Sequence, residues 1–161
     1  MKDLLKQYAS YNVWANQKMV NLLLTLPAET LQKEIASSFN SLHLTLLHML
    51  DTEQVWYQRM KLQENIQSIL RQTISTEDVA AGLINQSKQW EEWVDKNTIA
   101  GLEHVFAYQN MKGEAFKQPL YQMVLHLFNH QTYHRGQIVT MLRHAGVEAI
   151  PPTDFILWSR R

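Results

Sequence analysis

The chain has 161 residues, with 15 Lys and Arg balanced by 15 Asp and Glu, seven His and no Cys. This length fits a single domain spanning residues 1–161. Without Cys, the chain cannot form a disulfide, a cysteine-ligated zinc site or a cysteine nucleophile. A net charge of zero argues against general nucleic-acid binding, which needs a basic face. A hydrophobic fraction of 45% argues against disorder.

Targeting and membrane signals are missing from the sequence. The N-terminal run MKDLLKQYASYNVW lacks the long apolar stretch of a signal peptide. No segment approaches the roughly 20 apolar residues of a membrane span. We therefore expect a cytoplasmic protein with neither a membrane nor a nucleic-acid partner. Seven His is a high count for this length, so their positions along the helices bear on function.

Apolar residues near the N-terminus recur every three or four positions, which predicts a helix over about 2–26. Pro27 ends this helix, and residues 28–35 have room for one short extra turn. The residues of the apolar row are Leu4, Tyr8, Tyr11, Ala15, Met19, Leu22 and Leu26.

Two further helices are predicted in the middle of the chain. One is expected over about 39–62, with Ser37 and Ser38 as candidate N-caps, because a Ser side chain accepts backbone N–H groups at helix starts. Another is expected over about 76–96. Ser75 precedes this helix, and together with the acidic Asp78 three positions further on it resembles a capping box.

The pattern changes before the last helix. Residues 102–108 alternate between apolar and polar, which is typical of a strand, and residues 109–113 are rich in turn formers. Residues 114–118 can return as a second strand. A small hairpin is therefore expected here.

A fourth helix is predicted from Pro119, which suits a first helical position, to Ala145, with Gly146 as the stop. Four helices of roughly 20 to 27 residues favour an all-α four-helix bundle, with the hairpin as an attachment before the last helix. The local signals leave the order of the helices open.

The predicted fourth helix carries histidines in its inward row. Residues four apart are neighbours on a helix face, so the imidazoles of His130 and His134 can reach one point. His126 extends the row at a slightly rotated angle. The whole row reads Met123, Leu127, His130, His134, Ile138, Met141 and Ala145.

The predicted second helix has a matching histidine, His48, in a row with Leu44 and Val55. Facing helices build metal sites in bundle cores, so His48, His130 and His134 are candidates for a three-imidazole site. Imidazole suits Zn, Ni, Fe and Cu, and three protein ligands leave a position for water or substrate. A histidine on an apolar face can also be a core residue with a satisfied hydrogen bond, so both interpretations stay open.

The other histidines fit supporting roles or none. His43 lies five residues before His48, so it points roughly 140° away and cannot share its metal. His43 and His126 are candidates to orient a ligand imidazole. His104 in the hairpin and His144 near a helix end have no predicted function.

The run over residues 125–137 resembles the signature of the DinB family, Asn-His-x-x-x-His-Arg-Gly-Gln. The family's first-helix motif is matched by residues 11–16, its second-helix motif by residues 41–48, and its tail by residues 151–155. Tyr133 stands where many relatives carry a second His, a difference that alters no expected ligand.

The resemblance implies an up-down-down-up four-helix bundle, usually a homodimer. It also implies a divalent metal, often nickel or zinc, on a triad that falls on His48, His130 and His134. The wider superfamily includes S-transferases that use low-molecular-weight thiols such as bacillithiol, mycothiol and glutathione. It also includes metal-dependent hydrolases.

We therefore expect a thiol S-transferase acting on small electrophiles, since a metal ionises a thiol whose pKa is ~8.5. The alternatives are a hydrolase with metal-activated water, or a non-catalytic, stress-associated metal-binding dimer. The nucleophile would be a metal-bound water or thiolate, and no general base is assigned. Asn12, Asn129 and Gln137 join His43 and His126 as candidates to orient imidazoles or line a pocket. Core hydrogen bonding is the alternative role for the three amides.

Overall fold

The computed structural model describes residues 1–110 and 112–161, which form four long helices and three short ones. The long helices are α1 (Lys2–Leu23), α3 (Leu42–Met60), α4 (Thr76–Lys96) and α6 (Leu120–His144). The short helices are α2 (Ala28–Gln32), α5 (Ile99–Glu103) and α7 (Phe155–Ser159). Within these described ranges, no helix combines the length and the apolar character that a bilayer crossing requires.

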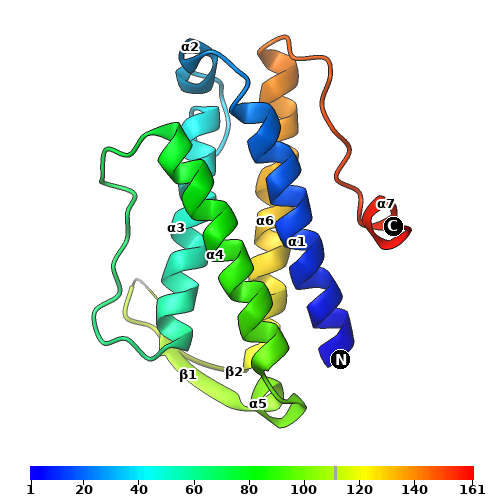
Figure 1. Cartoon of the computed structure of the whole chain (residues 1–161). Coiled ribbons are helices and arrows are strands. Elements are labelled where there is room, and N and C mark those ends of the chain that lie inside the picture. Colours follow the sequence, from blue (N-terminus) through cyan, green and yellow to red (C-terminus); the bar gives the residue numbers. More distant parts are fainter. Residues whose placement is uncertain (111) are drawn as a thin grey trace.

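The long helices form a bundle in which α1 and α3 each pack against both α4 and α6. In Figure 1, α1 and α6 run upward and α3 and α4 run downward, which confirms the up-down-down-up order. Because α3 and α4 are parallel neighbours, the connection over residues 61–75 has to return along the length of the bundle. The consecutive helices α1 and α3 lie across the bundle from each other, and so do α4 and α6.

The start of α3 differs from the prediction. Its N-cap is Ser41 rather than the predicted Ser37 or Ser38. The Oγ atom of Ser41 accepts a hydrogen bond from the backbone N–H three residues further on. Ser38 instead accepts a hydrogen bond from the side chain of Gln137 on α6, at 2.8 Å. Ser75 caps α4 as predicted, accepting the N–H of the third residue on at 3.0 Å.

The inward face of α1 also differs from the predicted apolar row. Leu4 is 60% exposed, and the neighbouring Leu5 is buried instead. Asn12 and Asn16 are fully buried on this face. The row predicted from apolar spacing is therefore rotated around the helix axis relative to the face that is buried. Leu44 of α3 is likewise exposed rather than inward-facing.

The predicted hairpin is present as the antiparallel strands β1 (Val105–Gln109) and β2 (Ala115–Pro119). The first strand starts later than predicted, because Leu102 belongs to α5. Met111, in the predicted turn, lies outside the described residues. Gly113 has φ +81°, a backbone conformation that glycine adopts without steric cost.

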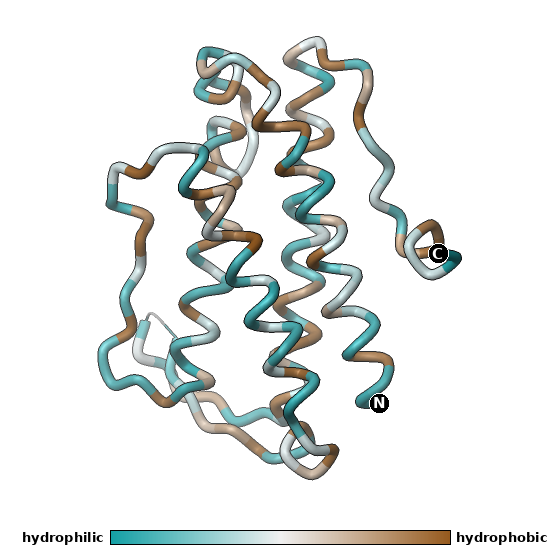
Figure 2. Tube along the Cα trace, viewed as in Figure 1, coloured by the Kyte–Doolittle hydropathy of each residue, from teal (hydrophilic) through white to brown (hydrophobic). Residues whose placement is uncertain are grey.

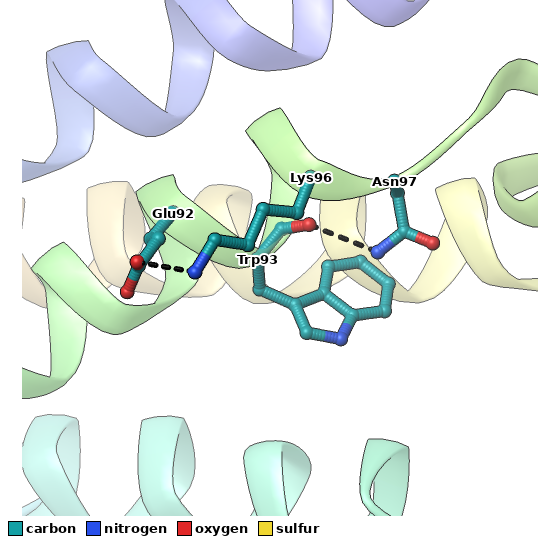
Figure 3. A network of polar contacts seen from close by, with 4 residues as sticks. All are labelled: Glu92, Trp93, Lys96 and Asn97. Atoms are coloured by element: carbon teal, nitrogen blue, oxygen red, sulfur yellow. Dashed lines mark hydrogen bonds and ion pairs between the residues drawn. The ribbon is translucent and has the colours of Figure 1, made fainter.

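The C-terminal end of α4 leads toward the end of the bundle that carries this hairpin (Figure 1), and Figure 3 shows the polar contacts at that helix end. The side chain of Asn97 donates to the backbone carbonyl of Trp93 at 2.9 Å, and Lys96 pairs with Glu92 one turn earlier. Exposed pairs of this kind contribute little to stability. Thr98 then caps α5, and the chain crosses the end of the bundle to reach α6.

The limits of α6 follow the predicted signals closely. Pro119 is its N-cap, one position before the predicted one. Gly146 has φ +85° just past the C-cap, as expected for a glycine stop. The N–H of Val147 then donates to the carbonyl of Leu142 at 2.9 Å, which closes the last turn.

The interior consists of two apolar clusters separated by a layer of polar side chains. Hydrophobic and hydrophilic colours alternate along each long helix in Figure 2. One cluster includes Met19, Leu46 and Leu83, and the other includes Leu5 and Trp90. Between them lies what we call the polar layer, to which all four long helices contribute: Asn12, Asn16, Glu53, Ser87 and Arg135.

Candidate metal centre

Three histidines converge where α3 faces α6. His48 comes from α3, while His130 and His134 lie one turn apart on α6. The Nε2 atom of His130 lies 3.2 Å from Nε2 of His48 and 3.0 Å from Nε2 of His134. The ligand atoms of all three lie within 4.8 Å of one another. The structure therefore brings together the same three residues that the sequence singled out.

The spacing of these nitrogens fits a divalent ion. Imidazole nitrogens bound at ~2.0–2.1 Å in a tetrahedral arrangement lie roughly 3.3–3.4 Å apart. The observed separations of 3.0 and 3.2 Å are close to this value. Among the described residues, the metal-binding cluster consists of histidines only. Such a donor set suits Zn or Ni.

Burial keeps the three imidazoles neutral. Burial lowers the pKa of His48 to about 4, and the neighbouring His134 adds to this shift. Burial and the surrounding imidazoles lower the pKa of His130 to about 3. The pKa of His134 is also lowered, again mainly by burial. A metal binds the neutral form of imidazole, so the cluster is ready for a cation at neutral pH.

The ring of His134 is oriented by Gln137, one of the predicted supporting residues. The Oε1 atom of Gln137 lies 2.7 Å from Nδ1 of His134, while its Nε2 donates to Ser38 Oγ and to the Tyr133 hydroxyl. These two donations fix the amide so that its oxygen faces the imidazole. Nδ1 of His134 must then carry the proton, and Nε2 presents its lone pair to the cluster.

The ring of His48 is held by Phe39, which sequence reasoning missed. Phe39 stacks on the imidazole of His48 with centroids 4.1 Å apart, and its centroid lies 5.8 Å from that of His134. Phe39 precedes α3, so helical periodicity carries no signal for it. The hydroxyl of Thr52, one turn along α3, lies 3.4 Å from Nε2 of His48.

Three other predicted supporting residues lie away from the cluster. His43 is buried and bonds to Thr76 at 2.9 Å, so it joins α3 to α4. Asn12 donates to Glu53 in the polar layer. Asn129 is exposed, because it precedes His130 by one residue and points roughly 100° away from it. None of the three side chains makes a hydrogen bond to a described histidine of the triad.

His126 lies at the edge of the cluster, as its position one turn before His130 suggested. Its ring centroid is 6.0 Å from that of His130 and 5.7 Å from that of Trp56. Burial lowers its pKa. A neutral His126 can accept a proton near the site, although it does not contact the three converging nitrogens.

The acidic residues near His48 in sequence face elsewhere. Asp51 accepts hydrogen bonds from the Ser68 hydroxyl and from the Ile69 N–H, so it anchors the connection between α3 and α4. Glu53 is fully buried in the polar layer. Within the described part of the chain, no carboxylate therefore joins the three-histidine cluster, although the charge of Asp51 partly opposes the lowering of the pKa of His48.

The polar layer holds the helices that carry the triad. Arg135 follows His134 in sequence and points roughly 100° away from it around α6, toward α1. Its guanidinium donates to Asn12 Oδ1 and Asn16 Oδ1 of α1, both at 2.8 Å. Asn12 in turn donates to Glu53 of α3 at 3.0 Å. Among the described residues, Arg135 thus reaches the acid Glu53 only through the amide of Asn12, and the network fixes α6 relative to α1 and α3.

The fold and the cluster define a class: a four-helix-bundle protein with a three-histidine site between its second and fourth long helices. The family model named DinB family matches residues 1–159. The chain belongs to the DinB family. Protein DinB from Bacillus subtilis (strain 168) is 30% identical over 164 residues, which cover 98% of this chain and 95% of that protein.

Solved structures share the architecture. YfiT from Bacillus subtilis superposes with a TM-score of 0.74 over 92% of this chain and 91% of its own, at 15% identity. It is described as "a probable metal-dependent hydrolase with an unusual four-helix bundle topology". A DinB-like protein from Bacillus cereus has a TM-score of 0.69 over 89% of this chain and 91% of its own, at 23% identity. These likenesses show the fold.

Proposed function

We propose that the chain is a metal-dependent enzyme in which His48, His130 and His134 hold a divalent ion, nickel or zinc. The observation that carries the proposal is the convergence of the Nε2 atoms of three histidines, two half-buried and one buried, whose pKa values are lowered. Three protein ligands leave a coordination position open, as is typical of catalytic sites. When bound there, such an ion ionises a water or a thiol and polarises an electrophile.

The surrounding residues have distinct tasks in this proposal. Gln137 holds the proton on Nδ1 of His134, so that its Nε2 stays available. Phe39 covers the ring of His48 and limits the access of water from that side. The hydroxyl of Thr52 can donate to a bound anion, because its partner Nε2 would be taken up by the metal.

A thiol is our preferred nucleophile, which makes the chain a thiol S-transferase acting on small electrophiles. Among the described residues, the carboxylates of Asp51 and Glu53 are engaged in hydrogen bonds away from the triad, so neither is placed to take a proton from a bound nucleophile. A thiol with a pKa of ~8.5 is far more acidic than water, so a cation can stabilise its thiolate at neutral pH while the proton passes to solvent. The chain has no Cys, so the thiol would be a low-molecular-weight cosubstrate. The family resemblance supports the same chemistry.

Hydrolysis is the second candidate. It is favoured by the description of YfiT, whose fold the chain shares at a TM-score of 0.74. His126 would then be the group that accepts a proton, since its ring lies 6.0 Å from that of His130 and partial desolvation lowers its pKa.

Parallel assays separate these activities. Nickel- or zinc-loaded protein is incubated with 1-chloro-2,4-dinitrobenzene and bacillithiol, mycothiol or glutathione in turn, and separately with 4-nitrophenyl acetate. The proposal predicts metal-dependent consumption of one thiol, and its loss in the His130→Ala variant. Ester turnover without thiol consumption would favour the hydrolase. Inactivity in every assay would favour a metal-binding, stress-associated protein without turnover.

The family resemblance also supports a homodimer, and the absence of Cys suits a reducing cytoplasm. Light scattering coupled to size-exclusion chromatography tests the first proposal. A mass of twice the chain's 18.9 kDa is expected, and the mass of a single chain would contradict it.

A further inference from the structure

A cavity of about 810 Å³ lies between the C-terminal end of α3, the connection that follows it and the β1–β2 hairpin. Its volume falls in the range of small-molecule sites, roughly 300–1,000 Å³. None of the triad residues lines it, so the proposed metal chemistry leaves it unused. The charged and aromatic residues that line it are Arg59, Glu64, Phe106, Tyr108, Phe116 and Lys117.

Aromatic rings form the wall of this cavity on the hairpin side. Phe106 and Tyr108 lie on one face of β1, with centroids 6.2 Å apart and planes inclined by 13°. Phe116 of β2 stacks on Tyr108 at 5.6 Å. Three such rings offer an apolar surface that suits a flat or hydrocarbon part of a ligand.

The α3 side of the cavity carries a cation, Arg59, that has no hydrogen-bond or ion-pair partner among the described residues. The guanidinium of Arg59 lies 4.8 Å from the ring centroid of Trp56 and is only partly exposed. Its side chain makes neither a hydrogen bond nor an ion pair with any described residue. Lys117 adds a second cation, and Glu64, which is exposed, is the one acid among the lining residues.

An arginine held against an aromatic ring presents a rigid fork of N–H donors. This fork matches the paired oxygens of a carboxylate, sulfonate or phosphate. The stacking of Arg59 on Trp56 fixes the guanidinium in advance, so less side-chain entropy is lost when an anion binds. The cavity therefore combines an apolar wall with a prepared anion contact.

Trp56 connects this cavity to the candidate metal centre. Its ring lies 5.2 Å from that of Tyr108 on the cavity side and 5.7 Å from that of His126 on the other side. His126 in turn lies 6.0 Å from His130. A chain of aromatic rings thus runs from the triad to the cavity along the surface where α3 faces α6.

We propose that this cavity binds the distal part of the substrate, and that the substrate is an elongated organic anion with an apolar or aromatic portion. Arg59 binds the anionic group, and the rings of the hairpin contact the apolar portion. The link to catalysis rests on the proposed function. Arg59 follows His48 by 11 residues on α3, or roughly 16 Å along the helix, so one extended molecule can reach both.

Binding of a matched pair of dyes tests the cavity directly. The anionic probe is 8-anilinonaphthalene-1-sulfonate, and the neutral probe is N-phenyl-1-naphthylamine. The Arg59→Gln variant is expected to bind the anion about tenfold more weakly and the neutral dye as well as the wild type, because a charge-assisted contact is lost. Arg143→Gln, which removes an exposed cation from the other end of α6, should change neither affinity.

A second variant tests the apolar wall. Phe116 is 41% exposed on the hairpin, so Phe116→Ser is expected to fold and to weaken both dyes. Circular dichroism and binding of the neutral dye show whether the Arg59→Gln variant is folded. Unchanged affinity of the Arg59→Gln variant for the anion, or the absence of saturable binding in the wild type, would overturn the proposal.

The test of dye binding in the cavity can be distinguished from the test of activity at the metal centre. Dye binding is also measured on His130→Ala protein in EDTA, where the metal chemistry is absent. Dependence on Arg59 that persists there supports the cavity even if every activity assay fails. In active protein, Arg59→Gln should raise KM for one anionic reactant, the thiol or its co-reactant, which identifies the molecule that occupies the cavity. An unchanged KM for both would overturn the link to catalysis.

Discussion

At the scale of single residues, the amide of Gln137 decides which nitrogen of His134 faces the cluster. Its oxygen lies 2.7 Å from Nδ1, and its nitrogen is committed to Ser38 and Tyr133. By contrast, Nδ1 of His48 and Nδ1 of His130 are buried without a hydrogen-bond partner among the described residues. The orientation of the triad thus depends on one hydrogen bond and on the stacking of Phe39.

The Gln137→Ala variant tests this dependence. Loss of a group that orients a ligand typically costs 10- to 100-fold in metal affinity, and we expect about that loss here. Asn129→Ala is the matched control, because Asn129 is exposed on the same helix. Competition with a chromophoric chelator measures both affinities for zinc. Equal affinities in the two variants would contradict the role of Gln137.

The depressed pKa values predict that metal binding resists mild acid. The pKa is about 4 for His48 and about 3 for His130, and that of His134 lies below its ordinary value. Protons therefore compete with the metal at His48 and His130 only well below pH 6. Zinc affinity should fall by at most about fourfold from pH 8 to pH 6, the loss expected if His134 alone titrated as an ordinary imidazole, whereas three ordinary imidazoles would lose roughly 70-fold. A loss of that larger size, measured by the same chelator competition, would show that the imidazoles are not desolvated.

At the scale of helices, the polar layer sets the register that brings α3 and α6 together. It lies between two apolar clusters, and each long helix supplies at least one of its members. Buried polar residues of this kind interrupt the apolar periodicity of their helices. This is why the predicted face of α1 included Leu4 and omitted Asn12 and Asn16.

Arg135→Met should be strongly destabilising. The substitution leaves the buried oxygens of Asn12 and Asn16 without their donor, at a cost of about 2–4 kcal/mol in the free energy of unfolding. Arg143→Met, at an exposed position on the same helix, should change it by less than about 0.5 kcal/mol. Urea unfolding of metal-free protein compares the two. Similar small effects would mean that the layer does not hold α6 in place.

Glu53→Gln tests the protonation of the layer. Burial raises the pKa of Glu53 to about 8, although hydrogen bonds from Ser87 and Asn12 oppose the shift. In the unfolded chain this pKa is about 4.3, so the folded state binds the extra proton between these values. The stability that Glu53 contributes is therefore greatest below pH ~4.3 and is lost as the pH rises to about 8.

Gln resembles the protonated carboxyl group in shape. The variant should thus match the wild type within about 1 kcal/mol at pH 4, exceed its stability as the pH rises above about 4.3, and exceed it most at pH 9. Urea unfolding in EDTA at pH 4 and pH 9 measures the difference. A wild type that gains stability relative to the Gln variant between pH 4 and pH 9 would contradict the raised pKa.

Local sequence signals predicted those parts of the fold that depend on neighbouring residues. They predicted the capping Ser75, the glycine stop at Gly146 and the pairing of β1 with β2. They failed where a side chain forms its hydrogen bond with a residue that is distant in the sequence. Ser38 was a candidate cap for α3 but is bonded to Gln137, which lies 99 residues further along the chain.

At the scale of the whole molecule, the candidate site depends on contacts between distant parts of the chain. The i, i+4 pair on α6 is visible in the sequence, but His48 lies 82 residues before His130. Helical spacing indicated the three candidate ligands His48, His130 and His134, and the family resemblance supported the same three residues. Spacing could not predict the helix order, because the connections before α3 and before α4 are both long enough for several arrangements. It also could not predict Phe39 or the amide bridge at Arg135.

The metal content of the purified chain tests the central claim most directly. The protein is produced without a His tag, loaded with zinc or nickel, dialysed and analysed by inductively coupled plasma mass spectrometry. Wild type and His144→Ala, which changes an exposed histidine at the end of α6, should retain about one ion per chain. His48→Ala and His130→Ala should retain almost none. Equal metal content in all four proteins would contradict the assignment of the triad.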